Sequence, residues 1–405
     1  MEGNSMKQLF AVLLLSLAPF AGASGTELTA PQVQQNEEYG YGLSANENTL
    51  AVISSYGDFV GTGVVYVYQP TTKNWNTATL VAQLSASDGA PFLSVAVYGN
   101  VIVAGAAGEN QSRGLVYGFI EPEGGWKNAT QSFVLSASDG AAGDIFGSSI
   151  AFSNKTIVVG ATGHQVNGIN TGAAYVFTEP SSGWVSGTQT AELTSSDGGP
   201  LVGYSVAVNG PVVVVGVPGY NGGALLVYQE NVGGWQNSTE TAWLTYFHSG
   251  CAFLGQSVAI LGTTVVGSFG GECEGQRPVI VYNRPGDAWT SMSVPTAELM
   301  PRQKSNASQR FGWSLALTNK FLLVGDPLLG GYLNPHGAVF VYAAPQGGWQ
   351  NVVSATETEE INSGTHDSQF GNSVAAFSTG ALFIGAPGYT IDGDMNAGAV
   401  FIKSY

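Results

Sequence analysis

The chain has 405 residues and a formal net charge of −16 at pH 7, because 28 Asp and Glu outnumber 12 Lys and Arg. This balance argues against nucleic acid and anionic membranes as partners, since both are bound by clusters of Lys and Arg that release counterions. Only 10% of the residues are charged and 57 are glycine, which is typical of a turn-rich all-β protein.

The first residues resemble a secretory targeting segment. Lys7 precedes an apolar run over residues 9–17, and Ala21-Gly22-Ala23 has the small residues of a cleavage site. The sequence predicts a signal peptide over residues 1–23 and a mature, secreted extracellular chain over residues 24–405. The alternative is an uncleaved anchor, but the run is shorter than the roughly 20 residues that span a bilayer. We expect no membrane span in the mature chain.

A seven-fold repeat of roughly 50 to 60 residues fills the rest of the chain. Its anchor, usually Ser, an apolar residue and Ala, recurs at residues 42–44, 94–96, 149–151, 205–207, 257–259, 314–316 and 373–375. A β-type run that mostly ends in Gly follows, then a strand with alternating aromatics, then a Trp in six repeats. Short strands at such a period predict one ring of small sheets.

The third repeat shows the four strands that we expect in each sheet, at residues 148–152, 156–159, 173–177 and 188–193. Short turns such as Ser153-Asn154-Lys155 join the first two strands, so each repeat is predicted to be an antiparallel meander. The small residues of the anchor suit the crowded centre of the ring, and the Trp residues suit its wide rim.

The seventh repeat has three strands, and residues 27–30 match the fourth-strand motif of residues 192–195. The N-terminal strand is therefore predicted to pair into the last repeat and close the ring. The predicted fold is an all-β, seven-bladed β-propeller of four-stranded antiparallel blades, closed in this way.

Several segments resemble FG-GAP repeats. They are Phe146-Gly147-Ser148-Ser149 with Gly160-Ala161, Phe370-Gly371-Asn372-Ser373 with Gly385-Ala386-Pro387, and the lead-in Ala137-Ser138-Asp139-Gly140. The resemblance covers the mature chain, is closest to the bacterial and protist type, and extends to the propeller heads of integrin α chains. It implies extracellular ligand recognition and adhesion.

The sequence departs from the family's calcium-binding members. Those members have an Asp-rich loop between the first two strands, whereas this chain has turns such as Thr318-Asn319-Lys320. Calcium takes six to eight oxygen ligands, which such turns do not supply. We expect no cofactor and no family calcium site. Asp392, Asp394 and Asn396 are a candidate metal site, although the sequence lacks the downstream Glu of a cation loop.

The loops from strand four to strand one and from strand two to strand three are predicted to share one face, the natural binding surface. Candidate ligand-binding residues on it are Asp58, Glu109, Asp144, His164, Tyr220, Glu272, Asp326, Tyr332, His336 and Tyr389. Each is also interpretable as a solvated loop residue. No catalytic residues are predicted, because the four His lack metal-ligand spacing and no Gly-x-Ser-x-Gly elbow is present.

Cys251 and Cys273, both in the fifth repeat, are predicted to form a disulfide in the oxidising extracellular compartment. Five sequons, at Asn110, Asn128, Asn154, Asn237 and Asn306, are candidate glycosylation sites.

The resulting hypothesis is a monomeric, non-catalytic binding or adhesion module for an extracellular protein or matrix ligand. A glycan-binding propeller is the alternative, with exposed aromatic rings as sugar platforms, and a polysaccharide-active enzyme is a third. Loops that differ between repeats favour a protein ligand; repeated aromatic sites would favour a glycan.

Overall fold

The computed structural model describes residues 26–54, 62–72, 74–246, 253–270, 277–302, 310–331, 335–352, 357–377 and 380–404. The predicted signal peptide and the cysteine pair, Cys251 and Cys273, lie outside these residues. Within them, no helix is both long and apolar enough to cross a membrane.

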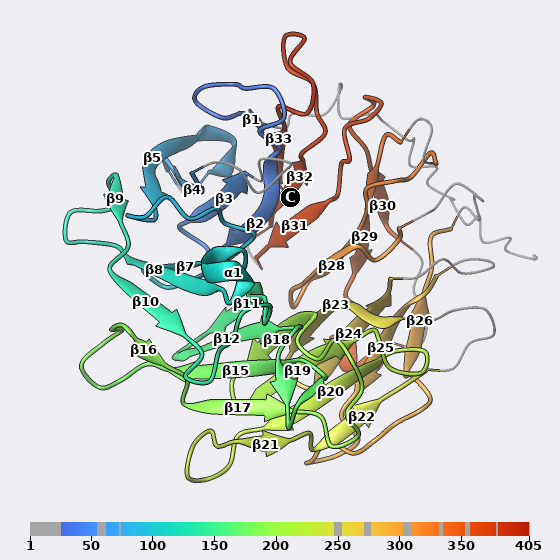
Figure 1. The fold of residues 1–405 in the computed structure, drawn as a ribbon. Helices are drawn as coiled ribbons and strands as arrows, with labels where there is room; N and C mark the ends of the chain where they lie inside the picture. The colour runs from blue at the N-terminus through green and yellow to red at the C-terminus, as the bar shows by residue number, and fades with distance from the viewer. Residues whose placement is uncertain are drawn as a thin grey trace, which may run out of the picture.

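Seven antiparallel sheets stand around a central axis as the blades of a propeller, in chain order from blue to red in Figure 1. The first three blades, from inner to outer strand, are β2 (Tyr39–Ala45), β3 (Leu50–Ser54), β4 (Val64–Pro70), β5 (Ala78–Ser85); β6 (Ser94–Tyr98), β7 (Val101–Ala106), β8 (Leu115–Ile120), β10 (Phe133–Ser136); and β11 (Phe146–Ser153), β12 (Thr156–Ala161), β15 (Ala173–Thr178), β17 (Ala191–Thr194). The next three are β18 (Ser205–Asn209), β19 (Val212–Val217), β20 (Ala224–Gln229), β22 (Ala242–Leu244); β23 (Leu254–Leu261), β24 (Thr264–Phe269), β25 (Val279–Asn283), β26 (Ala297–Leu299); and β27 (Ser314–Leu317), β28 (Phe321–Asp326), β29 (Ala338–Ala343), β30 (Glu359–Ile361). The predicted seven-bladed all-β propeller is confirmed.

The seventh blade closes the ring with both ends of the described chain. It contains β31 (Ser373–Ala376), β32 (Ala381–Ala386), β33 (Ala399–Ser404) and, outermost, β1 (Thr26–Leu28). β1 pairs antiparallel with β33, with Thr26 opposite Ile402 and Leu28 opposite Val400, as the sequence predicted.

Three blades have a fifth strand that belongs to the following repeat. β9 (Ala129–Thr130), β16 (Gly187–Thr188) and β21 (Ser238–Thr239) pair in parallel with β5, β10 and β17 of the preceding blade. The prediction that residues 188–193 form one strand was therefore wrong: Thr188 lies on the second blade, and the fourth strand of the third blade starts at Ala191. The donated strand covers an outer edge that would otherwise be free.

The remaining elements are short. A hairpin of β13 (Gln165–Val166) and β14 (Ile169–Asn170) lies in the loop between β12 and β15. A one-turn segment, α1 (Glu109–Ser112), lies between β7 and β8, and the 3₁₀ turns η2 (Trp75–Thr77) and η3 (Trp349–Asn351) precede outer strands.

The hydrophobic core consists of seven clusters, one between each pair of neighbouring blades. The six repeated tryptophans are all buried in these clusters: Trp75, Trp126, Trp184, Trp235, Trp289 and Trp349. Trp184 of the third blade stacks on Phe133 of the second, with ring centroids 5.8 Å apart. The predicted packing role of the Trp residues is confirmed, and burial excludes these six as exposed sugar platforms.

A carbonyl lock joins neighbouring blades near the axis. The Gly203 carbonyl of the fourth blade accepts a hydrogen bond from Ser149 Oγ of the third at 2.8 Å. Gly160, directly opposite Ser149, packs so closely under this oxygen that a Cβ there would clash with it. The same Ser, Gly and carbonyl recur at four more interfaces, with carbonyls of Gly147, Gly255, Gly371 and Gly40 accepting from Ser94, Ser205, Ser314 and Ser373.

Gly160→Ala tests this lock. The added methyl group forces the two blades apart, and we expect it to cost about 1 to 3 kcal/mol of unfolding free energy, measured by chemical denaturation. Gly187→Ala is the matched control, because a Cβ at Gly187 meets nothing within 4 Å and we expect no change. Equal stability of the two variants would contradict the lock.

Deleting residues 26–30 tests the closure. The deletion exposes the edge of β33, so we expect a lower thermal midpoint and concentration-dependent association in light scattering. A chain that starts at residue 24 is the control. A truncated protein that stays monomeric with an unchanged midpoint would show that β1 is not required.

Candidate functional site

The loops from strand four to strand one, and from strand two to strand three, lie on one face of the ring, which we call the loop face. The loops from strand four to strand one lead from each blade to the next. The loops from strand two to strand three connect neighbouring strands at the same end of each blade. A cluster of one histidine and several carboxylates lies there, at the third blade.

His164, in the loop after β12, is the centre of this group and is only 6% exposed. Its Nδ1 lies 2.9 Å from Oδ2 of Asp144, which is 2% exposed and precedes β11. The same Asp144 oxygen accepts a hydrogen bond from the backbone N–H of Ala141 at 2.9 Å. We assign Nδ1 of His164 as the donor to this carboxylate oxygen, and the contact fixes the orientation of the ring.

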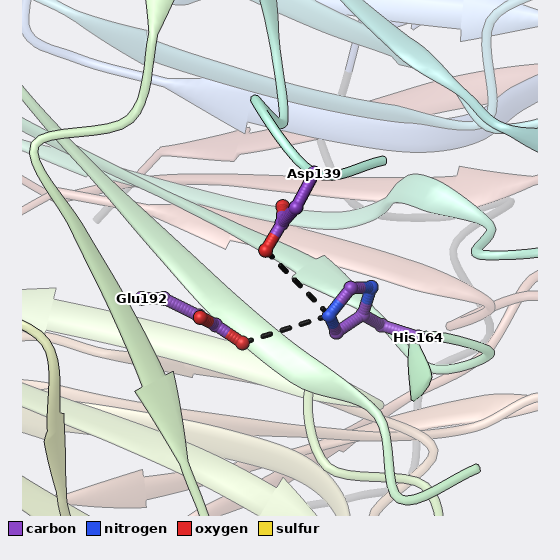
Figure 2. Close-up of side chains that lie close together, drawn as sticks. All are labelled: Asp139, His164 and Glu192. Atoms are coloured by element: carbon purple, nitrogen blue, oxygen red, sulfur yellow. Dashed lines mark ion pairs between the residues drawn. The ribbon is translucent and has the colours of Figure 1, made fainter. Parts of the chain in front are cut away.

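Two further carboxylates face the other imidazole nitrogen. Nε2 of His164 lies 3.8 Å from Oδ2 of Asp139 and 3.6 Å from Oε1 of Glu192. Asp139 belongs to the loop after β10, and Glu192 to β17, so three separate segments meet here. Figure 2 shows both carboxylates pointing toward this nitrogen.

Tyr175 on β15 contacts both Asp139 and His164. Its hydroxyl donates to Oδ1 of Asp139 at 3.1 Å, and its ring makes an edge contact with His164 at 5.7 Å between centroids. Burial and the carboxylate of Asp139 raise the pKa of Glu192 above its usual range. Burial, with Asp139 and Glu192 nearby, raises the pKa of Tyr175, so its hydroxyl stays protonated.

An arc of apolar side chains is the second feature of the loop face. Ile145, Leu201 and Phe253 occupy equivalent positions at the entry to the third, fourth and fifth blades, and we call them the apolar arc. They are 38%, 38% and 46% exposed. All three have left-handed backbones, with φ of 60°, 69° and 76°.

The axis of the ring contains a cavity of about 260 Å³. The serines of the repeat anchor line it, together with Tyr204 and Trp313. Arg310 lies over the Trp313 ring, 4.3 Å from its centroid. The predicted place of the small anchor residues at the crowded centre is therefore correct.

The other predicted ligand-binding residues that the structure describes have their own contacts, outside the group around His164. Asp326 is buried at the end of β28 and accepts from the backbone N–H of Arg310, so it has a structural contact. Tyr220 donates to Asp197 at 2.7 Å, and Tyr389 packs edge-on against Phe401. Glu109 lies in α1, half-buried.

His336 is half-buried, and burial together with nearby His366 lowers its pKa. Asp392 and Asp394 are exposed in the loop before β33, where Asn396 donates to Asn36 at 3.2 Å. Asp58, Glu272 and Tyr332 lie outside the described residues.

Four of the five sequon asparagines are described, and all four are exposed: Asn110, Asn128, Asn154 and Asn237. Asn306 lies outside the described residues. Glycosylation of these positions stays a prediction.

Sequence reasoning placed His164 and Asp144 on the loop face but did not join them to Asp139, Glu192 and Tyr175. Asp139 and Glu192 were recognised only as parts of repeat motifs. The one available signal was their position at the ends of neighbouring strands, because residues 139, 164 and 192 are far apart along the chain.

Glu37 is the repeat equivalent of Asp144, two residues before β2. It is 1% exposed, and its Oε1 accepts from Tyr66 at 2.9 Å and Ser54 at 3.3 Å. No group of the described chain bonds its Oε2. Burial raises the pKa of Glu37 above 4.5, because the charged form is poorly solvated.

The raised pKa of Glu37 predicts that the free energy of unfolding decreases as the pH rises. As pH rises above 4.5, the unfolded chain loses this proton first, so folding stability falls until the pH passes the folded pKa. Glu37→Gln removes the charge and keeps the acceptor. We expect the variant to be more stable than the wild type at about pH 7.5 and the difference to shrink toward about pH 4 in urea denaturation. A difference that is independent of pH would contradict a buried charge.

Comparisons with known proteins agree with the architecture. The FG-GAP repeat family matches residues 130–177, from β9 through the end of the aromatic strand β15. No curated protein sequence matches the chain. Solved structures with a similar fold include a Bacteroides uniformis protein described as a candidate 6-phosphogluconolactonase, with 10% identity and a TM-score of 0.56 over 84% of this chain and 89% of that chain. At this identity the likeness shows the fold alone.

Proposed function

We propose that this FG-GAP repeat propeller is a secreted, monomeric and non-catalytic module that binds an extracellular protein ligand on its loop face, with the apolar arc at the centre of contact. The FG-GAP propeller fold supports a binding module in general. The arc identifies the part of the face on which we base the finer proposal.

The backbone of the arc is the observation that carries this proposal. A left-handed residue other than Gly, Asn or Asp is uncommon, and a β-branched residue such as Ile145 is an outlier there. Each costs on the order of 1 to 3 kcal/mol, and such strain clusters at functional sites. Glycine would relieve the strain, yet three consecutive blades have large apolar residues that are substantially exposed.

Backbone hydrogen bonds hold these residues in place, through both the N–H and the carbonyl at Ile145. The N–H of Ile145 donates to the Ser112 carbonyl at 2.7 Å, and the Ile145 carbonyl accepts from the N–H of Ser148. The Leu201 carbonyl likewise accepts from the N–H of Tyr204. A fixed backbone presents the side chains with little entropy left to lose, which favours binding.

The charge of the chain indicates the chemistry of the partner. With a net charge of −16, the protein attracts a basic ligand and repels an acidic one. The proposed ligand is therefore a protein segment with apolar side chains flanked by Lys or Arg. The six buried tryptophans disfavour the glycan alternative, which an experiment can still distinguish.

Selection of a random peptide library on the mature protein tests the proposal. We expect enriched peptides to combine an apolar anchor with basic residues. Ile145→Asn with Leu201→Asn should weaken their binding at least about tenfold, because the contacts buried by two apolar side chains are lost. Asn tolerates the left-handed backbone, so the variant should fold with unchanged or higher stability.

Val232→Asn with Val294→Asn is the matched control, since both valines are exposed in loops at the opposite end of the blades. This control should bind like the wild type. Peptides that lose affinity only with the control would overturn the proposed face. Binding on a glycan array without any peptide selection would favour the lectin alternative instead.

A further inference from the structure

We propose that Asp139, His164 and Glu192 form a binding site for a divalent transition metal of the zinc class, independent of the protein-ligand proposal. Within the described chain, these are the only three His, Cys, Asp or Glu residues whose ligand atoms lie close enough to share an ion, all within 4.8 Å of one another. The site lies on the loop face of the third blade.

The chemistry of His164 points to a cation between these side chains. Nδ1 of the ring faces Asp144, which leaves Nε2 directed toward Asp139 and Glu192. Among the described residues this nitrogen makes no hydrogen bond, and two carboxylate oxygens face it at 3.6 and 3.8 Å. Both distances are longer than the roughly 2.7 to 3.2 Å of an N–H···O hydrogen bond, so the three side chains face a gap that a cation with affinity for nitrogen and oxygen can fill.

The distances from Nε2 of His164 to the two carboxylates are compatible with a zinc ion between them. Zinc bonds to His nitrogen and carboxylate oxygen are about 2.0 to 2.2 Å, which sets tetrahedral ligand atoms about 3.4 Å apart. The two distances from Nε2 are close to this value. The carboxylates must approach each other to complete the set, and the Asp139 side chain is 43% exposed, so its surroundings leave room for a small shift.

The surrounding groups are those that orient metal ligands. A carboxylate that accepts from the second imidazole nitrogen fixes the tautomer and makes the metal-binding nitrogen more basic. Asp144, which is only 2% exposed, is the carboxylate that contacts Nδ1 of His164. Tyr175 fixes one oxygen of Asp139 and leaves the other directed toward Nε2.

The ligand types select the class of metal. An imidazole nitrogen suits zinc, copper, iron and nickel, whereas calcium and magnesium prefer oxygen ligands in larger number. Three protein ligands leave one tetrahedral position for water or a partner's oxygen. The site is unrelated to the Asp-rich loops between strands one and two that bind calcium in other FG-GAP proteins.

Isothermal titration of the mature, EDTA-treated protein with ZnCl₂ tests the site, with Co²⁺ absorption as a second readout of coordination. We expect one equivalent of zinc and a tetrahedral Co²⁺ band that Zn²⁺ displaces, with no competition from Ca²⁺ or Mg²⁺. His164→Ala should weaken binding at least about 100-fold, and Glu192→Gln and Asp144→Asn about 10- to 100-fold.

Two controls match these variants. His336→Ala removes a second loop-face histidine, which is half-buried, and Asp392→Asn with Asp394→Asn removes another acidic pair. Both should bind zinc like the wild type, and circular dichroism checks that every variant folds. Zinc binding that is equal in the wild type and His164→Ala would overturn the proposal. So would no zinc binding to the folded wild type, which would make the cluster an ion pair around a protonated imidazole.

Discussion

One carbonyl oxygen per blade interface organises this propeller. At five interfaces of the described chain, the glycine that starts a blade directs its carbonyl into the preceding blade, where a serine hydroxyl donates to it and a glycine makes room for it. The serine and the second glycine are cross-strand neighbours, as Ser149 and Gly160 show. Because this contact needs a hydroxyl, a left-handed glycine and a missing Cβ at once, all three recur with the repeat.

The entry to each blade, next to this carbonyl contact, is also where the loop face has residues with a strained backbone. The residue two positions before each of these glycines turns into the inner strand with a left-handed backbone. At Ile145, hydrogen bonds to Ser112 of the preceding blade and Ser148 of its own blade hold this conformation. At Ile145, Leu201 and Phe253 that position has a large apolar residue instead of the Glu38 or Gln369 of other blades. The fold supplies the rigidity, and side-chain choice at one repeat position distinguishes blades three to five.

The third blade adds a polar site next to the apolar arc. Asp144 is adjacent to Ile145 in the same loop, so the residue that orients His164 and the first residue of the arc share one backbone segment. A ligand on the arc would therefore contact the loop that supports the proposed metal site. The two proposals remain separable, because one concerns exposed apolar atoms and the other a buried imidazole.

The sequence by itself determined the ring, its seven blades, its closure through residues 27–30 and the inward and outward places of Ser and Trp, because each follows from comparing the repeats with one another. It also placed Asp144 and His164 on one face, since strand order fixes loop direction. Only the tertiary structure decided that Thr188 pairs with the preceding blade and that Asp326 is buried. It alone joined residues 139, 164 and 192, because contacts between side chains of different strands depend on register and twist, which leave no fixed spacing along the chain.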